Sequence, residues 1–493
     1  MPLHIAADLI TRVVAPEQYG TVAAGLILFA LLHGWSQGPR LLQREERLEA
    51  AQRKARTKNT RVAVTAGLSD MHARVVLIAT GAMSPLGVVT IATLGQQGAH
   101  VIALVPDVSA PDVIQMILLL RESTQNENIF AEQCDMGDLA SISTFAARWN
   151  QGPVDQSGAR SSAALMEQTP GQHRLDTLLF LPTEEAPYLL GTSLMPGKNT
   201  YARKGDSAQA PERSYVYEVL GRFHLVNSLL PSLLQAPPDR DIRIITAVSP
   251  WYAAGRALFD AVAEPLVRFS STKPLFQPWT WLGGVNLRWI CLNRELQRRL
   301  DILSAADTRP RTRLPGIDVE EPRYLPKMDK LPRRSNISAI CVCPGFERSS
   351  QLSAFLGIVP PFAKHRLHSI VLLVLLVVLY PLIWLFGKGT SHAADAVVWG
   401  VTARIESRQT MLRRIALQQQ GTPEASLSEE LRAALNDDAP EAAYQWPGLC
   451  PGALYREGRM MRDPSPATDT GALWSATEAQ VEAIVGVRRP KNG

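Results

Sequence analysis

The stretch RVVLIATGAMSPLGVVTIATLGQQGAHVIALV, residues 74–105, decides the fold. An apolar, β-branched run at 74–80 ends at Thr80-Gly81, a helical pattern follows at 86–98, and a second apolar run covers 100–105. Short apolar runs of this kind are typical of strands in a parallel sheet, because helices cover both faces of such a sheet. The stretch therefore predicts a β-α-β unit.

The same alternation continues along most of the chain. Further strand patterns lie at 128–134, 175–181, 242–248 and 337–343, and further helical patterns at 112–124, 139–150, 214–234 and 285–303. Strands that alternate with helices predict an α/β fold, a doubly wound parallel sheet with right-handed crossovers. The ligand site of such a fold lies at the carboxyl ends of the strands.

Strand and helix patterns resume after each polar interruption, which predicts one Rossmann-like domain over 72–480 with a tail at 481–493. Three loop insertions are expected inside it: 150–173 is rich in Gly, Ser, Gln and Pro, 306–336 in Pro and charges, and 419–446 in acids and Ala. Insertions of this composition are candidate contact surfaces for protein partners.

An apolar segment lies near the N-terminus, at Tyr19–Trp35, and contains no Asp, Glu, Lys or Arg. Its 17 residues are at the short end for a membrane-spanning helix, and aromatic residues stand at both ends. We therefore expect a membrane anchor at 1–36 and a basic linker at 37–71. The linker's excess of Lys and Arg predicts that everything after the anchor faces the cytosol.

The second apolar segment, Ser369–Gly387, contains 19 uncharged residues and has basic residues on both sides. A helical pattern follows at 391–407. If that helix returns to the same core, 369–387 cannot cross a bilayer and must dip into one leaflet. We expect this segment to insert into the membrane, so a lipid bilayer is a predicted partner.

Composition also bears on nucleic-acid partners, disulfides and metal sites. The net charge is +5, and no basic stripe with aromatic platforms is present, so a nucleic-acid partner is not expected. The five cysteines include no Cys-x-x-Cys pair, which indicates neither a disulfide framework nor a metal site.

Six strings in chain order resemble the short-chain dehydrogenase/reductase superfamily, in particular its membrane-associated, retinol-dehydrogenase-like branch. They are ATGAMSPLGVVTIATLGQQGAHVIAL (79–104), AEQCDMGDLASISTF (131–145), RLDTLLFL (174–181), LGRFHLVNSLLPSLL (220–234), LNRELQRRL (292–300) and CPGFERSSQLSAFL (343–356). The resemblance implies a bilayer-dissolved substrate and a location at the cytosolic surface of the endoplasmic reticulum or of lipid droplets.

The resemblance also implies a weak NAD(P) site. Thr80, Gly81 and Gly87 match the family's glycine-rich turn, where backbone N–H groups meet the dinucleotide pyrophosphate. Pro85 stands at the middle glycine and removes one donor, which leaves Ser84 and the helix dipole for a phosphate. The turn is therefore either a damaged cofactor cradle or a turn kept only for packing.

Four further positions match cofactor contacts of the family. Asp107 follows the second strand and is a candidate for the ribose hydroxyl, and Asp135 matches the aspartate near the adenine or caps the next helix. Pro344 and Gly345 form the Pro-Gly motif after the last predicted strand.

The catalytic set departs from the family pattern. Ser249 matches the serine that binds the substrate carbonyl. Alignment back from residues 294–296 places Leu282 at the tyrosine and Asn286 at the lysine, and neither can replace a phenol beside a cation. Further departures are Glu218 at the relay asparagine and Leu181-Pro182-Thr183 at the Asn-Ala-Gly turn of the nicotinamide pocket.

A substitute pair is conceivable from Tyr252 and Arg256, which follow Ser249 closely. Three functions therefore stay open. The favoured one is a membrane-anchored, catalytically degenerate relative of these oxidoreductases. The alternatives are an active NAD(P)H-dependent oxidoreductase on a lipid ketone or alcohol through a rewired site, and a ligand-free membrane scaffold.

Overall fold

The computed structural model describes most of the predicted domain and the N-terminal helices. The described residues are 19–57, 68–151, 167–169, 172–182, 215–236, 240–258, 277–306, 335–348, 380–381, 383–406, 448–462, 464 and 470–488. The predicted insertions 150–173, 306–336 and 419–446, and residues 369–379 of the second apolar segment, lie largely or wholly outside these ranges.

An eight-stranded sheet forms the centre of the described part of the chain, in the order β3-β2-β1-β6-β7-β8-β9-β10. Its strands are β1 (Val75–Thr80), β2 (His100–Val105), β3 (Ile129–Gln133), β6 (Thr177–Phe180), β7 (Ile242–Ala247), β8 (Ile337–Cys343), β9 (Leu454–Arg456) and β10 (Arg459–Met460). The pairings from β3 to β9 are parallel, and β10 is antiparallel to β9. The sequence continues outward from β1 in both directions, which confirms the doubly wound fold. β4 (Glu167–Thr169) and β5 (Gln172–His173) form a separate small hairpin.

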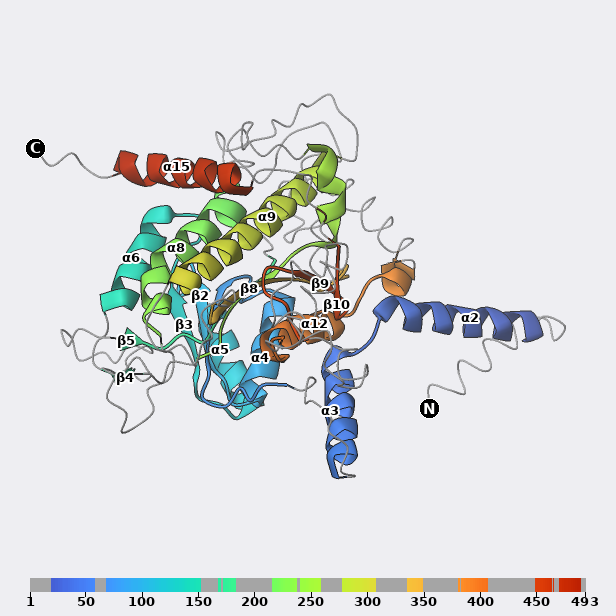
Figure 1. Cartoon of the computed structure of the whole chain (residues 1–493). Helices are drawn as coiled ribbons and strands as arrows, with labels where there is room; N and C mark the ends of the chain where they lie inside the picture. The colour runs from blue at the N-terminus through green and yellow to red at the C-terminus, as the bar shows by residue number, and fades with distance from the viewer. Residues whose placement is uncertain are drawn as a thin grey trace, which may run out of the picture.

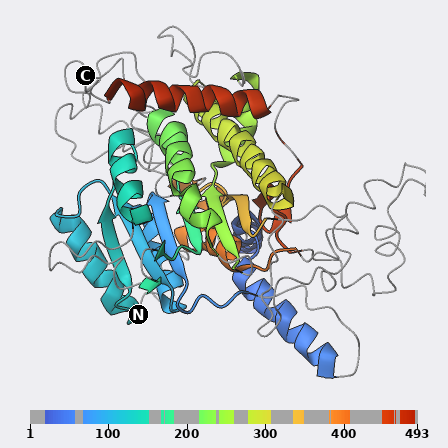
Figure 2. The same ribbon diagram turned by 60° about the vertical axis from the view of Figure 1, so that its left-hand side comes forward.

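Helices cover both faces of the sheet (Figure 1). One layer contains α4 (Pro85–Gln96), α5 (Pro111–Thr124) and α12 (Thr390–Thr402), and the other α6 (Leu139–Gln151), α8 (Arg222–Leu234) and α9 (Gln277–Ala306). Figure 2 shows α15 (Thr470–Arg488) lying across the second layer. Neighbouring strand residues alternate between the two cores, so Leu77 and Ile244 face one and Ile78 and Ile245 the other.

The helix predicted over 214–234 is not continuous. A π-helical turn, η5 (Val216–Gly221), precedes α8. Gly221 lies against the loop after β3, where an added Cβ would be 2.3 Å from the carbonyl oxygen of Met136. A π-helical turn contains one residue more than an α-helical turn. Here it includes the buried Glu218 and lies at this close approach. Such π-bulges are frequent at functional sites.

The N-terminal apolar segment forms α2 (Tyr19–Gln37), and α3 (Leu41–Thr57) follows it at a steep angle (Figure 1). Within the described ranges, no helix combines the length and the apolar character needed to cross a membrane. The transmembrane helix expected at Tyr19–Trp35 therefore has no support in the structure.

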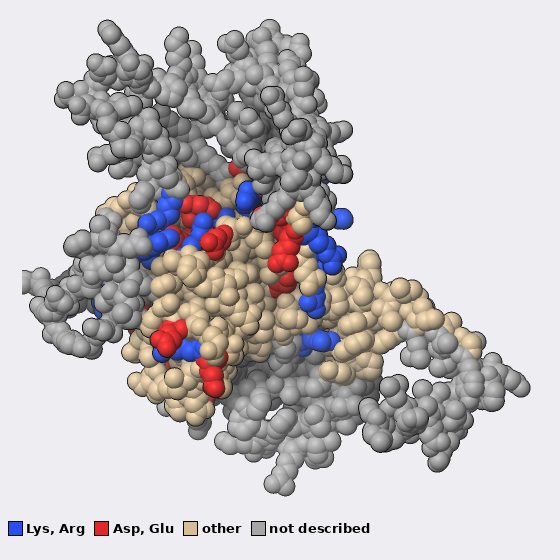
Figure 3. Space-filling model, turned by 90° about the horizontal axis from the view of Figure 1, so that it is seen from below, with Lys and Arg blue, Asp and Glu red and all other residues tan. Residues whose placement is uncertain are grey.

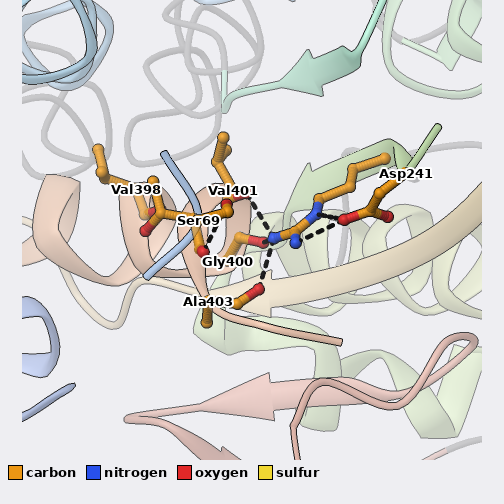
Figure 4. Close-up of polar contacts among 8 residues, drawn as sticks. Ser69, Asp241, Val398, Gly400, Val401 and Ala403 are labelled. Atoms are coloured by element: carbon orange, nitrogen blue, oxygen red, sulfur yellow. Dashed lines mark hydrogen bonds and ion pairs between the residues drawn. The ribbon is translucent and has the colours of Figure 1, made fainter. Parts of the chain in front are cut away.

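Arg243 of β7 fixes α12 to the sheet. Its side chain is 1% exposed, and its Nη1 donates to the carbonyl oxygens of Val401 (2.5 Å) and Ala403 (2.6 Å). Its Nη2 and Nε donate to Asp241 at 2.8 and 3.0 Å (Figure 4). The last carbonyls of a helix lack partners within it, so this guanidinium caps α12 from inside the protein. Ser69 adds a hydrogen bond to Thr402, which ties the start of the domain to the same helix end.

Replacing Arg243 with Met should destabilise the protein by about 3 kcal/mol, because the substitution leaves buried carbonyls without donors. The free energy of unfolding in urea measures this. Arg148→Met on α6 is the control, because Arg148 is exposed. Its effect should stay within about 0.5 kcal/mol. A loss below about 1 kcal/mol for Arg243→Met would contradict this role of the arginine.

Candidate functional site

The carboxyl ends of the parallel strands bring the candidate residues to one edge. Thr80 ends β1, Leu181 follows β6, Ser249 follows β7 and Pro344 follows β8. The Thr80 hydroxyl donates to the Leu181 carbonyl oxygen at 2.7 Å, which joins the carboxyl ends of β1 and β6. The strand order reverses between these two strands, and doubly wound folds bind their ligands at such a topological switch point.

The turn after β1 requires both of its predicted glycines. Gly81 has φ +66°, and an added Cβ would lie 2.5 Å from the carbonyl oxygen of Pro182. At Gly87 an added Cβ would lie 2.1 Å from the carbonyl oxygen of Gly81, so the first turn of α4 packs directly on the loop backbone. Two close backbone approaches in one turn are what a dinucleotide cradle requires.

Pro85 does not disrupt this turn. It occupies the first position of α4, where the N–H would have no partner in the helix. Ser84 is the N-cap, and its hydroxyl donates to the Gly81 carbonyl oxygen (2.7 Å) and accepts from the Gly87 N–H (3.0 Å). Ser84 is 5% exposed. The serine therefore stabilises the turn, and the positive end of the α4 dipole remains at the site.

Both predicted aspartates lie at the same edge. Asp107 is exposed after β2 and accepts a hydrogen bond from the Ser109 N–H at 2.8 Å. Asp135 is half-buried after β3 and accepts from the Gly137 N–H at 2.8 Å. Each carboxylate is oriented by its own loop.

The predicted catalytic serine, Ser249, is held by Asn286, the residue that the sequence resemblance matches to a catalytic lysine. The backbone N–H of Ser249 donates to Asn286 Oδ1 at 3.0 Å, and Asn286 Nδ2 donates to the Leu282 carbonyl oxygen at 2.8 Å. Ser249 is 3% exposed, and Leu282 packs against the apolar core. Asn286 therefore orients the loop after β7, and positions 282 and 286 carry neither a phenol nor a cation.

A buried ion pair occupies the relay position. Glu218 is 5% exposed and Arg222 2% exposed, and the two side chains pair one helical turn apart. Arg222 Nη2 also donates to the Leu181 carbonyl oxygen at 3.2 Å. Sequence reasoning noticed Glu218 alone. The Glu-x-x-x-Arg spacing inside an apolar stretch was the signal for the pair.

A phenol–guanidinium pair lies beside Ser249. Tyr252, in the 3₁₀ turn η6 (Pro250–Leu258), is hydrogen-bonded by the side chain of Arg456 from β9. Burial raises the pKa of the Tyr252 phenol, and the guanidinium opposes that rise. The partner expected from the sequence, Arg256, lies outside the described side chains. The sequence patterns did not predict strand β9, so they could not identify Arg456 as the partner of Tyr252.

The Pro-Gly motif after β8 is covered by a lysine that sequence reasoning missed. Gly345 has φ +94°, and an added Cβ would lie 2.9 Å from Cδ of Lys388. Lys388 is 8% exposed in its side chain and pairs with Glu457 at 3.0 Å. Its backbone N–H donates to the Phe346 carbonyl oxygen at 2.7 Å. Residues 383–389, termed the return segment below, therefore lie beside the motif.

The strand order and the parallel pairings define a doubly wound α/β protein, and the candidate residues lie at the carboxyl edge of its sheet. Among the side chains that the structure describes, no group of three or more His, Cys, Asp or Glu could hold a metal ion.

Comparison with known proteins gives relatives but no family model, since none matches the chain. An uncharacterized oxidoreductase of Saccharomyces cerevisiae is 26% identical over 333 residues, which cover 67% of this chain and 68% of that protein. An uncharacterized oxidoreductase of Schizosaccharomyces pombe is 24% identical over 326 residues, covering 66% and 69%.

Similar solved structures have lower sequence identities. An uncharacterized protein of Mycobacterium paratuberculosis is 16% identical with a TM-score of 0.40, covering 85% of this chain and 98% of that one. A short chain dehydrogenase of Salmonella enterica is 14% identical with a TM-score of 0.34, covering 65% and 92%.

Replacing Gly81 with Ala should destabilise the protein by about 2 kcal/mol, because the new Cβ meets the Pro182 carbonyl oxygen at a positive φ. Gly284→Ala in α9 is the matched control, since a Cβ there meets nothing within 4 Å. The control should be neutral or stabilising by up to about 1 kcal/mol. Equal effects of the two substitutions on urea unfolding would refute the requirement for glycine in the turn.

Proposed function

We propose that this protein is a membrane-associated, NAD(P)-binding relative of the short-chain dehydrogenases/reductases whose catalytic tyrosine–lysine pair has been lost. One observation carries the proposal. Asn286, at the lysine position, uses its amide to fix the Ser249 backbone and the Leu282 carbonyl. An amide in that role cannot lower the pKa of a phenol, and no phenol stands at position 282.

The residues at the edge fit a dinucleotide. Gly81 and Gly87 let backbone approach closely, and the N-terminus of α4 offers a positive dipole end to the pyrophosphate. Asp107 would hold the ribose, Asp135 the adenine end, and the Pro344-Gly345 turn the nicotinamide end. NAD(P)H supplies a hydride when bound. With one N–H donor fewer at Pro85, we propose weaker binding than in active relatives.

A second candidate function is favoured by the Tyr252–Arg456 hydrogen bond. Tyr252 lies at the same strand edge as Ser249, and its backbone N–H donates to the Ser249 carbonyl oxygen at 3.2 Å. A phenol held by a guanidinium is the arrangement that a proton-donating tyrosine needs. The protein would then be an active oxidoreductase on a lipid ketone or alcohol.

The exposed apolar surface of α2 and the basic linker after it support a place on the cytosolic face of a membrane, at the endoplasmic reticulum or a lipid droplet. A ligand-free scaffold that binds proteins through its insertions is the remaining alternative. Cofactor binding distinguishes that alternative from the first two.

Titration of the purified full-length protein with NADPH and NADH, followed by fluorescence, should show saturable micromolar binding of at least one cofactor. Asp107→Asn should favour NADPH over NADH by about fivefold relative to wild type, because it removes a negative charge near the ribose. Asp112→Asn is the matched control, an exposed carboxylate on α5, and should change nothing. No binding up to millimolar cofactor would overturn the proposal and leave the scaffold.

Incubation with NADPH and a panel of lipid ketones should give no substrate-dependent oxidation of the cofactor. Turnover that falls about a hundredfold in Tyr252→Phe, and not in Tyr380→Phe, would contradict catalytic degeneracy and establish the rewired site. Tyr380 is a suitable control because it is 53% exposed and lies outside the candidate site.

A further inference from the structure

Helix α2 and the return segment are joined into one unit. Trp384 stacks on His33 with ring centroids 3.6 Å apart, and on Phe29 at 5.4 Å. The buried amide of Gln37 donates to the Gly387 carbonyl oxygen (2.8 Å) and accepts from the Gly389 N–H (3.0 Å). Two segments about 350 residues apart are therefore fixed to each other at the base of α2.

This unit exposes large apolar side chains. On α2, Ile27, Leu28, Leu31 and Trp35 are 61, 58, 66 and 78% exposed. Tyr380 and Phe386, next to and within the return segment, are 53 and 56% exposed. Exposed apolar surface of this extent marks an interaction site. Because α2 projects away from the sheet (Figure 1), the rest of the described protein does not cover it.

Basic side chains gather at the base of the same unit: Arg40, Arg348 and Lys388, with the imidazole of His392, whose pKa is lowered by burial. Arg348 Nη2 and His392 Nδ1 would lie 3.6 and 4.0 Å from a Cβ added at Gly389, the N-cap of α12. The four residues are termed the basic rim. The positive end of the α12 dipole points to the same place.

Two acids face the rim. Asp395 Oδ2 accepts from the Leu41 N–H at 2.5 Å and attracts Arg40 and His392, and Glu457 pairs with Lys388 of the rim at 3.0 Å. Arg40 and Arg348 are the rim cations outside that ion pair. Within the described residues, Nη1 of Arg348 and Nδ1 of His33 are buried and have no hydrogen-bond partner. Figure 3 shows the projecting lobe free of charged side chains, with Lys and Arg side chains where it joins the body.

We propose that α2 and the return segment form one docking unit for a bilayer surface that contains anionic phospholipids. The apolar side chains of α2, Tyr380 and Phe386 enter the acyl boundary, and the exposed Arg40 and half-buried Arg348 of the basic rim meet the lipid phosphates. Charge complementarity selects this occupant, because apolar side chains bordered by cations match the acyl chains and phosphates of an anionic leaflet. The inference rests on the membrane association proposed above and adds the class of lipid.

Flotation of the full-length protein tests this proposal, with vesicles of phosphatidylcholine alone and vesicles in which phosphatidylserine replaces part of it. We expect binding about tenfold tighter or more to the anionic vesicles. Arg40→Gln should weaken anionic binding about fivefold and leave neutral binding unchanged. Arg148→Gln, an equally exposed arginine on α6, is the matched control and should have no effect. Leu31→Glu should reduce binding to both kinds of vesicle.

The outcomes distinguish the role of the basic rim from the membrane association on which it rests. Equal binding to neutral and anionic vesicles would overturn the role of the basic rim and leave the membrane association standing. No binding to either vesicle would overturn both. Binding that is unchanged in Leu31→Glu would overturn the assignment of α2 as the inserted element.

Discussion

The buried guanidinium of Arg243 is the contact that fastens the N-terminal helices, through α12, to the sheet. It joins the central strand β7 to the end of α12, and α12 in turn holds the N-terminal helices through Asp395 at Leu41 and through Gly389 at Gln37. The chain that leaves the sheet after β8 therefore comes back to the same body.

The polar groups at the strand edge hold the loops around the candidate site in place. Asn286 orients the Ser249 loop, and the Glu218–Arg222 pair supports the loop after β6 through the Leu181 carbonyl. Buried polar groups need partners, and here each partner belongs to the scaffold. The glycine turn has the close backbone approaches that the proposed cofactor site needs, and these approaches do not involve Asn286 or the Glu218–Arg222 pair.

Sequence patterns were sufficient for the elements that apolar runs define. Strands β1 to β3 and β6 to β8 lie within a residue or two of their predicted bounds, because each is a buried apolar run between turn residues. The π-helical turn and β9 were missed, since neither has a periodic signature. Contacts such as Tyr252 with Arg456 and Lys388 with Gly345 join distant parts of the chain, and a single sequence holds no signal for such pairs.

The most direct test of the account is a hydrogen-exchange footprint of NADPH on the full-length protein. The account predicts slower exchange in the turn at 81–88 and in the loops after β2, β3 and β8, with α5 and α15 unchanged. Slower exchange at other surfaces only, at saturating cofactor, would contradict a retained dinucleotide site at the carboxyl edge of the sheet.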